Sequence, residues 1–310
     1  MMYEITVEKS NVRLDSYIAE FVPDISRSYA VTLITDGLIC VDGKQVKPSA
    51  KTVIGSHIQI DMPTPQITDT LPENIPLDIV YEDHDLLVIN KPQGMVVHPA
   101  AGHYSGTLVN ALLYYCKGQL SDLNGVIRPG IIHRIDKDTS GLLIAVKNNE
   151  IHEKMAKMIA AHEVVRKYRC CVYGVLDSDK GTIDAPIGRS HTDRRRMTVK
   201  ADGKPSITHF EVVERFPNAT DLAVVLETGR THQIRSHLSF IGHPAIGDPI
   251  YASRRPTFGM VGQALHSKSL SFVHPSTGKR IDIEIDLPQY YQTLIETLRA
   301  DTMPLKTEKA

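Results

Sequence analysis

Four prolines within fifteen residues divide this chain of 310 residues into two parts of unequal length. They lie in residues 62–76, "MPTPQITDTLPENIP", where no apolar periodicity is present. Proline fixes φ and has no backbone N–H to donate, so such a segment favours a linker over a helix or a strand. We therefore expect an N-terminal domain over residues 1–62, a linker over 63–76, a larger domain over 77–300 and a flexible tail over 301–310.

The N-terminal part has the pattern of a small α/β domain. Apolar residues recur at helical spacing over residues 13–22, and a second helix is expected to begin with Ser26 as its N-cap and to end at Gly37. A hairpin is predicted to turn at Asp42–Gly43, and a strand over residues 57–61 completes the unit.

This order of two short helices and a small hairpin resembles the S-four RNA-binding domain, which is named for a ribosomal protein. The resemblance covers residues 12–62. It implies that the domain contacts RNA through basic side chains, and the matching positions are Arg13, Arg27 and Lys44.

The second part alternates strand-like runs with amphipathic helices. Helices are predicted over residues 106–116 and 149–163, and strands outnumber them, many joined by short turns. We therefore expect the α+β class with a mixed, largely antiparallel sheet, and not a doubly wound fold. No G-x-G-x-x-G or G-x-x-x-x-G-K-[ST] string occurs, which removes the usual cradles for dinucleotides and nucleoside triphosphates.

Two carboxylates lie in the stretch "GIIHRIDKDTSGLLIAVKN", residues 130–148, between apolar runs that predict two buried strands. An aspartate on a tight turn is held rigidly by its flanks and is ionised at neutral pH. Asp136 is the better candidate for chemistry, because at a strand end it would share a face with Arg134. Asp138 precedes the turn residues and favours capping that turn. A loop of solvated charges explains this stretch equally well when it is taken alone.

Three further segments carry polar side chains that a structural core would not need. A strand ending at Gly229 leads into a helix whose first turns hold Arg230 and Arg235, a set suited to an anion. Tyr168 lies in an otherwise apolar strand, where a lone tyrosine is usually part of the core. Residues 189–204 carry six basic and two acidic residues on a chain of net charge −1, which favours either a polyanion contact or a solvated loop.

Four motifs in a fixed order closely resemble pseudouridine synthases of the RluA/RluD type. They are "VINKPQGMVVHP", "HRIDKDTSGLLIAVKN", "KYRCCVYG" and "LETGRTHQIRSHL…GHPAIGDPIY", and the resemblance runs over residues 77–287. These enzymes detach uracil from its ribose, rotate it and rejoin it through carbon 5. With the S-four-like domain in front, the chain resembles the two-domain branch that modifies large-subunit ribosomal RNA.

The resemblance implies a role for each matching residue. Asp136 matches the catalytic aspartate, as nucleophile or base, Tyr168 the tyrosine that stacks on the target base, and Arg230 the basic residue that pairs with the aspartate. Further matches are Arg134, in the space the base vacates or on the neighbouring phosphate, Ile234 as an apolar wall and Arg235 as a phosphate contact. With an RNA substrate, the basic segment that holds Arg194, Arg195 and Arg196 is expected to be an RNA-binding loop. No metal and no organic cofactor is implied.

The partner expected from this resemblance is RNA, most readily ribosomal RNA or a pre-ribosomal particle. Transfer RNA as the substrate, and an RNA-binding protein without catalysis, remain as alternatives. A glycoside hydrolase that uses Asp136 with Asp138 is disfavoured, because two residues on one turn are poorly placed to flank a sugar at about 5 Å or more.

Location and assembly are expected from simple absences in the sequence. No apolar run approaches the roughly 20 residues of a membrane-spanning helix, and the N-terminus lacks a secretory pattern. The four cysteines include no C-x-x-C pair, which favours reduced thiols over a zinc site. We therefore expect a cytoplasmic location, and the resemblance to the two-domain branch implies a monomer.

Overall fold

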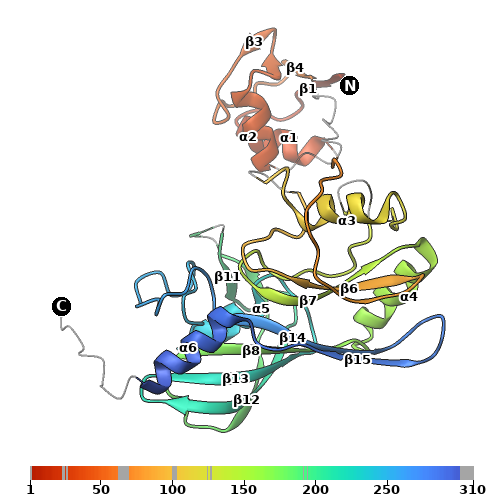
Figure 1. Ribbon diagram of the computed structural model, residues 1–310. Helices are drawn as coiled ribbons and strands as arrows, with labels where there is room; N and C mark the ends of the chain where they lie inside the picture. Colours follow the sequence, from red (N-terminus) through yellow and green to blue (C-terminus); the bar gives the residue numbers. More distant parts are fainter. Residues whose placement is uncertain are drawn as a thin grey trace. The chain divides into compact units, whose positions relative to one another are not determined.

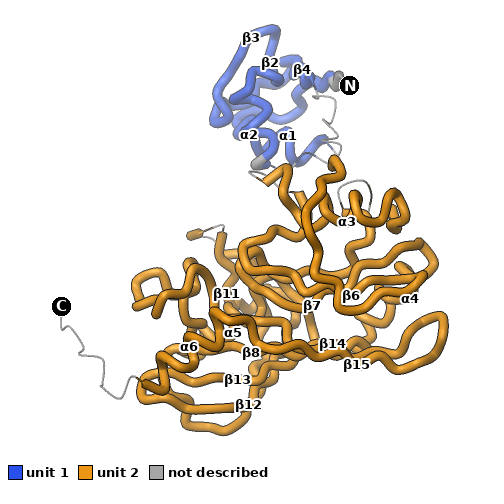
Figure 2. The backbone as a smooth tube through the Cα atoms, in the orientation of Figure 1, with its two compact units in different colours: residues 1–69 blue, residues 70–310 orange. Residues whose placement is uncertain are grey.

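The computed structural model describes residues 2–22, 25, 27–61, 70–99, 103–123, 125, 128–190, 192–193 and 195–300. The chain forms two compact units, residues 1–69 and 70–310, which Figure 2 colours blue and orange. Among the described residues, no helix combines the length and the apolar character needed to cross a membrane.

The N-terminal unit is an antiparallel sheet of strand order β1-β4-β2-β3 with two helices (Figure 1). Its elements are β1 (Met2–Thr6), α1 (Leu14–Phe21), α2 (Arg27–Thr35), β2 (Ile39–Val41), β3 (Lys44–Gln45) and β4 (His57–Asp61). The predicted hairpin is confirmed, because Asp42 and Gly43 both have positive φ, 50° and 72°, as a two-residue hairpin turn requires. The predicted N-cap Ser26 lies outside the described residues.

The C-terminal unit is built on one large sheet of strand order β5-β6-β7-β14-β8-β13-β12-β9, with β15 paired to β14 (Figure 1). The strands β10 and β11 form a separate two-stranded sheet. Its elements are β5 (Ile79–Glu82), β6 (Leu86–Lys91), α3 (Leu108–Cys116), β7 (Ser140–Val146), α4 (Asn149–Ala160), β8 (Val165–Tyr173), β9 (Lys180–Asp184), β10 (Ile187–Arg189), β11 (Met197–Val199), β12 (Ile207–Phe216), β13 (Ala219–Leu226), α5 (Gln233–Phe240), β14 (Leu265–Val273), β15 (Arg280–Glu284) and α6 (Gln289–Ala300).

The large sheet bears out the predicted fold class. Its neighbouring strands run antiparallel except β7 and β14, which pair in parallel within the described part of the chain. That parallel pair brings Ser140, at the start of β7, opposite His266. Both faces of the sheet are covered, α3 and α5 contributing to the core on one face and α4 and α6 to the cores on the other. Every residue of β7 is buried as a consequence.

The segment before β7 departs from the strand–turn–strand predicted for residues 130–148. Ile131 makes a single bridge to Ala145, and residues 133–136 have no regular structure. Ile131 and Ile135 are both buried in the core that covers one face of the sheet. The segment therefore packs against the sheet instead of extending it, and it leads directly into the turn that bears Asp136.

The end of the predicted linker belongs to the C-terminal unit. The backbone N–H of Glu73 donates to the Asn110 carbonyl at 3.0 Å, and the Asn110 side chain donates to the Leu71 carbonyl at 2.8 Å. Residues 62–69 and the predicted tail, residues 301–310, lie outside the described part of the chain.

Candidate active site

Asp136 lies in a pocket between the segment before β7, the strand β8 and the start of α5. Its backbone carbonyl accepts the Thr139 N–H at 3.1 Å, which closes the turn that leads into β7. The side chain is 16% exposed, so it reaches solvent only through the pocket. The lining residues are Arg134, Ile135, Asp136, Thr139, Arg166, Tyr168, Leu226, Gly229, Arg230, His232, Gln233, Ile234, Arg235 and Leu265, which we call the Asp136 pocket.

A buried arginine is the ion-pair partner of Asp136. The Arg235 Nη1 atom donates to Asp136 Oδ2 at 2.8 Å. The rest of its guanidinium is held by Asp248, with Nε to Oδ2 at 2.7 Å and Nη2 to Oδ1 at 2.9 Å. The side chains of Arg235 and Asp248 are 4% and 0% exposed. Such a fork of charge-assisted bonds fixes the guanidinium in both distance and direction.

The structure pairs Asp136 with Arg235 and not with Arg230, the residue expected to make this pair, while the expected contact of Arg235 with a phosphate stays a prediction. Arg230 is exposed and donates from Nε to the Pro205 carbonyl at 3.3 Å. The helix begins only at Gln233, after His232 in the left-handed region with φ 53°. Arg235 thus lies in the first turn of α5, facing the pocket, whereas Arg230 stays in the preceding loop at its rim.

The electrostatics of the pocket keep Asp136 ionised. Burial opposes ionisation, but the Arg235 guanidinium, with smaller contributions from His232 and Arg134, holds the pKa of the Asp136 carboxyl below its ordinary value. Burial lowers the pKa of His232, whose Nε2 atom lies 4.0 Å from Asp136 Oδ1. The site therefore presents a desolvated carboxylate at neutral pH, as a nucleophile or base requires.

The other expected pocket residues come together around Asp136. Tyr168 and Ile234 line the pocket and are 5% and 4% exposed, and Arg134 is exposed at its rim. Burial raises the pKa of the Tyr168 hydroxyl, so it is protonated at pH 7. The expected common face of Arg134 and Asp136 does not arise from a strand, since this segment is irregular, but both side chains still line one pocket.

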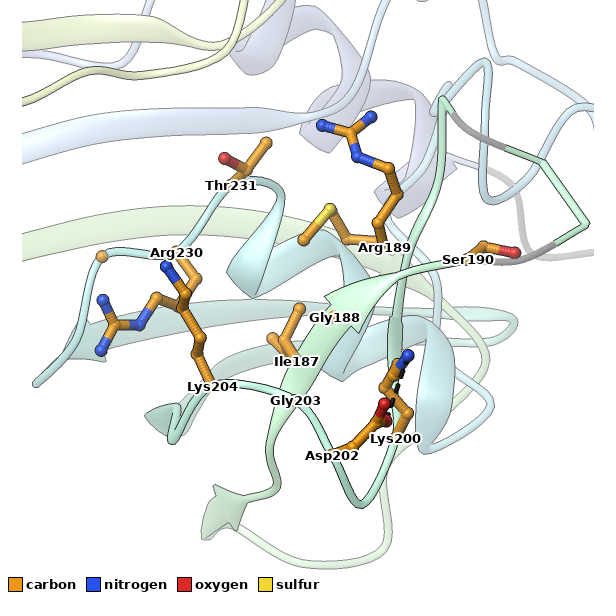
Figure 3. Close-up of a pocket in the computed structure, with 12 residues that line it drawn as sticks. Ile187, Gly188, Arg189, Ser190, Lys200, Asp202, Gly203, Lys204, Arg230 and Thr231 are labelled. Carbon is orange, nitrogen blue, oxygen red and sulfur yellow. Dashed lines mark ion pairs between the residues drawn. The ribbon is translucent and has the colours of Figure 1, made fainter. Parts of the chain in front are cut away.

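A second hollow adjoins the pocket and contains part of the basic segment. Gly229 and Arg230 line both, and Figure 3 shows Arg189, Lys204 and Arg230 on the walls of this second hollow, with the ion pair between Lys200 and Asp202. We call it the β10–β11 hollow. Its cations, and the two residues that it shares with the Asp136 pocket, suit the path of a polyanion.

The expected RNA-binding arginines of this segment have different surroundings. Arg195 is exposed and pairs with Asp193 at 3.1 Å, while the guanidinium of Arg196 lies 4.9 Å from the Tyr251 ring centroid. Tyr251 also contacts Arg235, 5.3 Å from its guanidinium carbon, so this loop is linked to the ion pair of the pocket. Arg194 lies outside the described residues.

In the N-terminal unit, two of the three expected RNA contacts share one buried acid. Arg13 and Arg27 lie 2.8 Å and 3.3 Å from Asp15, which is 2% exposed in its side chain. The side chains of Arg13 and Arg27 are 42% and 58% exposed. Lys44 is exposed on β3.

Three residues in or beside the pocket were given no role from the sequence. Asp248, which fixes Arg235, is the acid of the string "GHPAIGDPIY", and Arg166 lies two residues before Tyr168. His232, in the string "TGRTHQIR", was likewise given no role. A basic residue two positions before the pocket tyrosine shares its strand face, so the alternation of β8 was the signal for Arg166.

Comparison with known proteins identifies the family. A model described as RNA pseudouridylate synthase matches residues 85–240, and one described as S4 domain matches residues 12–53. A Bacillus subtilis protein named as an uncharacterized RNA pseudouridine synthase, YlyB, is 49% identical over 94% of this chain and 96% of its own length. The chain belongs to the RNA pseudouridylate synthase family. It is an RNA pseudouridine synthase, an isomerase, with an S4 domain at its N-terminus.

Further members of the family carry a more specific name. Proteins named ribosomal large subunit pseudouridine synthase D are 43% identical in both Zymomonas mobilis, over 95% of this chain and 96% of that one, and Pseudomonas aeruginosa, over 96% and 95%. The solved structure of human RNA pseudouridylate synthase domain containing 1 matches with a TM-score of 0.54 and 25% identity, over 77% of this chain and 99% of that one. The family assignment thus agrees with the fold.

Proposed function

We propose that this synthase isomerises uridines of large-subunit ribosomal RNA, with Asp136 as its essential carboxylate. The observation that carries the proposal is the pair of linked ion pairs Asp136–Arg235–Asp248. They hold one ionised carboxylate in a pocket that the buried Tyr168 also lines. The ribosomal substrate is supported by the relatives named for it and by the S4 domain. We also propose that the protein is cytoplasmic and monomeric, as expected in the analysis of its sequence.

The chemistry assigned to Asp136 is the transfer of uracil on its own ribose. The carboxylate acts on the sugar, either by attack at C1′ or by removal of a sugar proton, and the C1′–N1 bond breaks. The uracil turns and C5 bonds to C1′; on the first route the bond between C1′ and the carboxylate breaks in this step, and on the second route the sugar regains the proton that the carboxylate took. C5 then loses its proton to a base, and N1 gains a proton. Arg235 holds the carboxylate ionised and aimed before the substrate arrives.

The remaining pocket residues are assigned to the base and its strand. The target base has to leave its stack, at a cost of a few kcal/mol, and Tyr168 with Ile234 supplies an apolar site for it. Arg134 at the rim is assigned to the space that the base vacates. Arg230 is assigned to the RNA strand that crosses the rim into the β10–β11 hollow, and no longer to the aspartate.

Pseudouridine mapping tests this proposal. Unmodified large-subunit ribosomal RNA and bulk transfer RNA are incubated with the wild type, and the new pseudouridines are mapped by chemical labelling and primer extension. We expect product in the ribosomal RNA. Product in transfer RNA alone would keep the reaction and overturn the substrate, and binding without product on either RNA would favour the catalytically silent alternative.

A further inference from the structure

A buried arginine stands on the wall between the Asp136 pocket and a third hollow. Arg166 lies on β8 two residues before Tyr168, so both side chains project from the same face of the strand. The residue is only 5% exposed, yet it lines both spaces. The third hollow is bounded by the segment 131–134, the end of α4 and the loop 227–230, and contains His98. We call it the His98 hollow.

No protein group neutralises this guanidinium in the described part of the chain. The Nε atom of Arg166 is buried without a hydrogen-bond partner, and no carboxylate among the described residues forms an ion pair with the side chain. Buried arginines are normally paired or fully hydrogen bonded, because the loss of hydration is otherwise uncompensated. Because this unpaired guanidinium lines two hollows, it is suited to bind an anionic ligand.

The backbone at Gly229 leaves room for this guanidinium. A Cβ atom added to Gly229 would lie 2.8 Å from Nη1 of Arg166, which is closer than carbon and nitrogen atoms approach without a shift. Gly229 lines the Asp136 pocket, the β10–β11 hollow and the His98 hollow. The Arg166 side chain therefore packs against a residue that lines all three spaces.

The charge around the His98 hollow is strongly positive. The arginines that line it are Arg128, Arg134, Arg166 and Arg230. The acid on its wall, Glu227, accepts from His209 Nε2 at 2.6 Å. Four guanidinium groups against one engaged carboxylate make this space a site for an anion.

Two neutral imidazoles add hydrogen-bonding capacity to the same wall. The Nε2 atom of His133 accepts the Ile144 N–H at 3.0 Å, so its proton is on Nδ1, which is buried without a partner. The Nδ1 atom of His98 is also buried without a partner. Burial lowers the pKa of His98 to about 4 and that of His133 to about 3, so both imidazoles are neutral at pH 7 and the positive charge of the hollow comes from its arginines.

We propose that Arg166 binds a backbone phosphate of the substrate RNA next to the target uridine, at the corner between the Asp136 pocket and the His98 hollow. A phosphodiester offers two anionic oxygens that match the fork of a guanidinium, and every nucleotide carries one. A uridine turned out of its stack into the pocket leaves its flanking phosphates at the pocket mouth. Arg166 is in this role a positioning residue, which places the ribose against Asp136. The proposal rests on the proposed function for the identity of the RNA.

Arg166→Gln and Lys167→Gln form a matched pair of variants. Lys167 is the next residue on β8, is exposed and projects from the opposite face. Binding of a fragment of large-subunit ribosomal RNA is measured by fluorescence anisotropy, and turnover by pseudouridine formation. We expect Arg166→Gln to weaken binding and lower kcat/KM by about 10- to 100-fold, as for the loss of a charged hydrogen-bond pair. Lys167→Gln should change both by less than about threefold, and equal losses in the two variants would overturn the proposal.

A phosphate scan tests the contact itself without relying on a buried substitution. Each phosphate of the RNA fragment is replaced in turn by an uncharged methylphosphonate, and binding is measured with the wild type and with Arg166→Gln. We expect that one methylphosphonate weakens RNA binding by the wild type by the same factor as Arg166→Gln weakens binding of the unmodified RNA. The same methylphosphonate should not weaken RNA binding by Arg166→Gln any further. Additive losses at every phosphate would overturn the contact.

The same data separate this proposal from the proposed function. Absence of pseudouridine with the wild type would contradict the function, while the binding scan would still decide on the phosphate contact. Arg166→Lys keeps the charge but not the fork of the guanidinium, and should recover part of the lost affinity. A Lys variant as weak as the Gln variant, with wild-type thermal unfolding, would contradict a charge-based contact.

Discussion

At the scale of the residue, the site depends on which arginine faces Asp136. The sequence "TGRTHQIR" offers two, five residues apart, and the start of α5 decides between them. Arg235 is buried and bound by two carboxylates, whereas Arg230 is exposed. A buried guanidinium loses little of its attraction to solvent screening, which is why Arg235 controls the charge of Asp136.

Substitution of the two arginines should have unequal effects. Arg235→Gln leaves Asp136 and Asp248 without their partner, and we expect the free energy of unfolding to fall by about 3–5 kcal/mol. With Arg235 gone, burial dominates and raises the pKa of Asp136, so the acid limb of the activity profile should move to higher pH. Arg230→Gln should change unfolding by less than about 0.5 kcal/mol. Urea denaturation and a pH profile of kcat provide the comparison, and equal destabilisation would contradict the assigned ion pair.

At the scale of the element, a buried lysine fastens the end of β6 to the turn of Asp136. Lys91 Nζ donates to the carbonyls of Pro92, Met95 and Lys137, at 2.8, 2.8 and 3.0 Å. Gln93 adds a hydrogen bond to the Asp138 carbonyl at 3.0 Å. The loop after β6 thereby holds both residues that follow Asp136 in the chain.

Removal of this ammonium group should loosen the turn. Lys91→Met leaves three carbonyls without their donor, and we expect a loss of about 2–4 kcal/mol in the free energy of unfolding, measured in urea. Lys137→Met is the matched control, because its side chain is exposed and only its backbone carbonyl is used. A loss as large in the control would argue against the clamp.

The helix α1 carries an acid whose titration should be visible in the N-terminal unit. Hydrogen bonds from Arg13 hold the pKa of Asp15 at about 2, against burial, with a smaller contribution from Arg27. A folded pKa below the unfolded value stabilises the protein above about pH 4, and this contribution disappears as the pH falls toward 2. Because both arginines are partly exposed, we expect at most about 2 kcal/mol.

Thermal unfolding of the N-terminal unit between pH 5 and pH 2 measures this contribution. Asp15→Asn should lack the loss of stability that the wild type shows over that range. Asp36→Asn, an exposed acid in the same unit, should follow the wild type. Parallel curves for all three proteins would contradict the assignment to Asp15.

Local sequence patterns predicted some of the helices and strands of this fold and missed others. Helices α3 and α4 begin at Leu108 and Asn149, after side-chain caps at Thr107 and Asn148, and short-range periodicity predicted both. Strand β14 was not predicted, since "LHSKSLSFV" carries buried His266 and Ser267 that no local rule places inside a sheet. The hydrogen bonds of Ser267 Oγ to the Leu142 carbonyl and of His266 Nδ1 with Ser140 Oγ join residues that only the folded chain brings near.

The candidate site shows the same division. Asp136, Tyr168 and Ile234 were predicted from motifs and do line one pocket. Local sequence patterns could not predict that Arg235, and not Arg230, pairs with Asp136. The left-handed conformation of His232 places the start of the helix at Gln233, later than the sequence suggested. Asp248 was missed because its partner lies thirteen residues away on another element.

At the scale of the whole molecule, affinity for RNA is expected to come from charges spread over several surfaces. The net charge is −1, so RNA is held by local clusters and not by the overall field. The loop with Arg194, Arg195 and Arg196 is one such cluster. Neutralising all three to glutamine should weaken RNA binding and reduce the slope of log K against log salt by up to roughly 0.7 for each lost phosphate contact on a single strand.

A salt titration of binding measures that slope. A control variant neutralises three exposed cations elsewhere on the C-terminal unit, Lys117, Lys154 and Arg280. Its slope should equal that of the wild type. An unchanged slope in the triple arginine variant would show that the loop is solvated and does not contact RNA.

The central claim is that the Asp136 carboxylate drives isomerisation of uridine in ribosomal RNA. Because C5 loses its hydrogen when it bonds to C1′, release of tritium from large-subunit ribosomal RNA labelled at C5 of uridine follows the reaction directly. We expect stoichiometric release by the wild type, and a rate reduced by about 10⁴-fold or more in Asp136→Asn with folding and RNA affinity retained. Release by Asp136→Asn at a rate close to that of the wild type would contradict the claim.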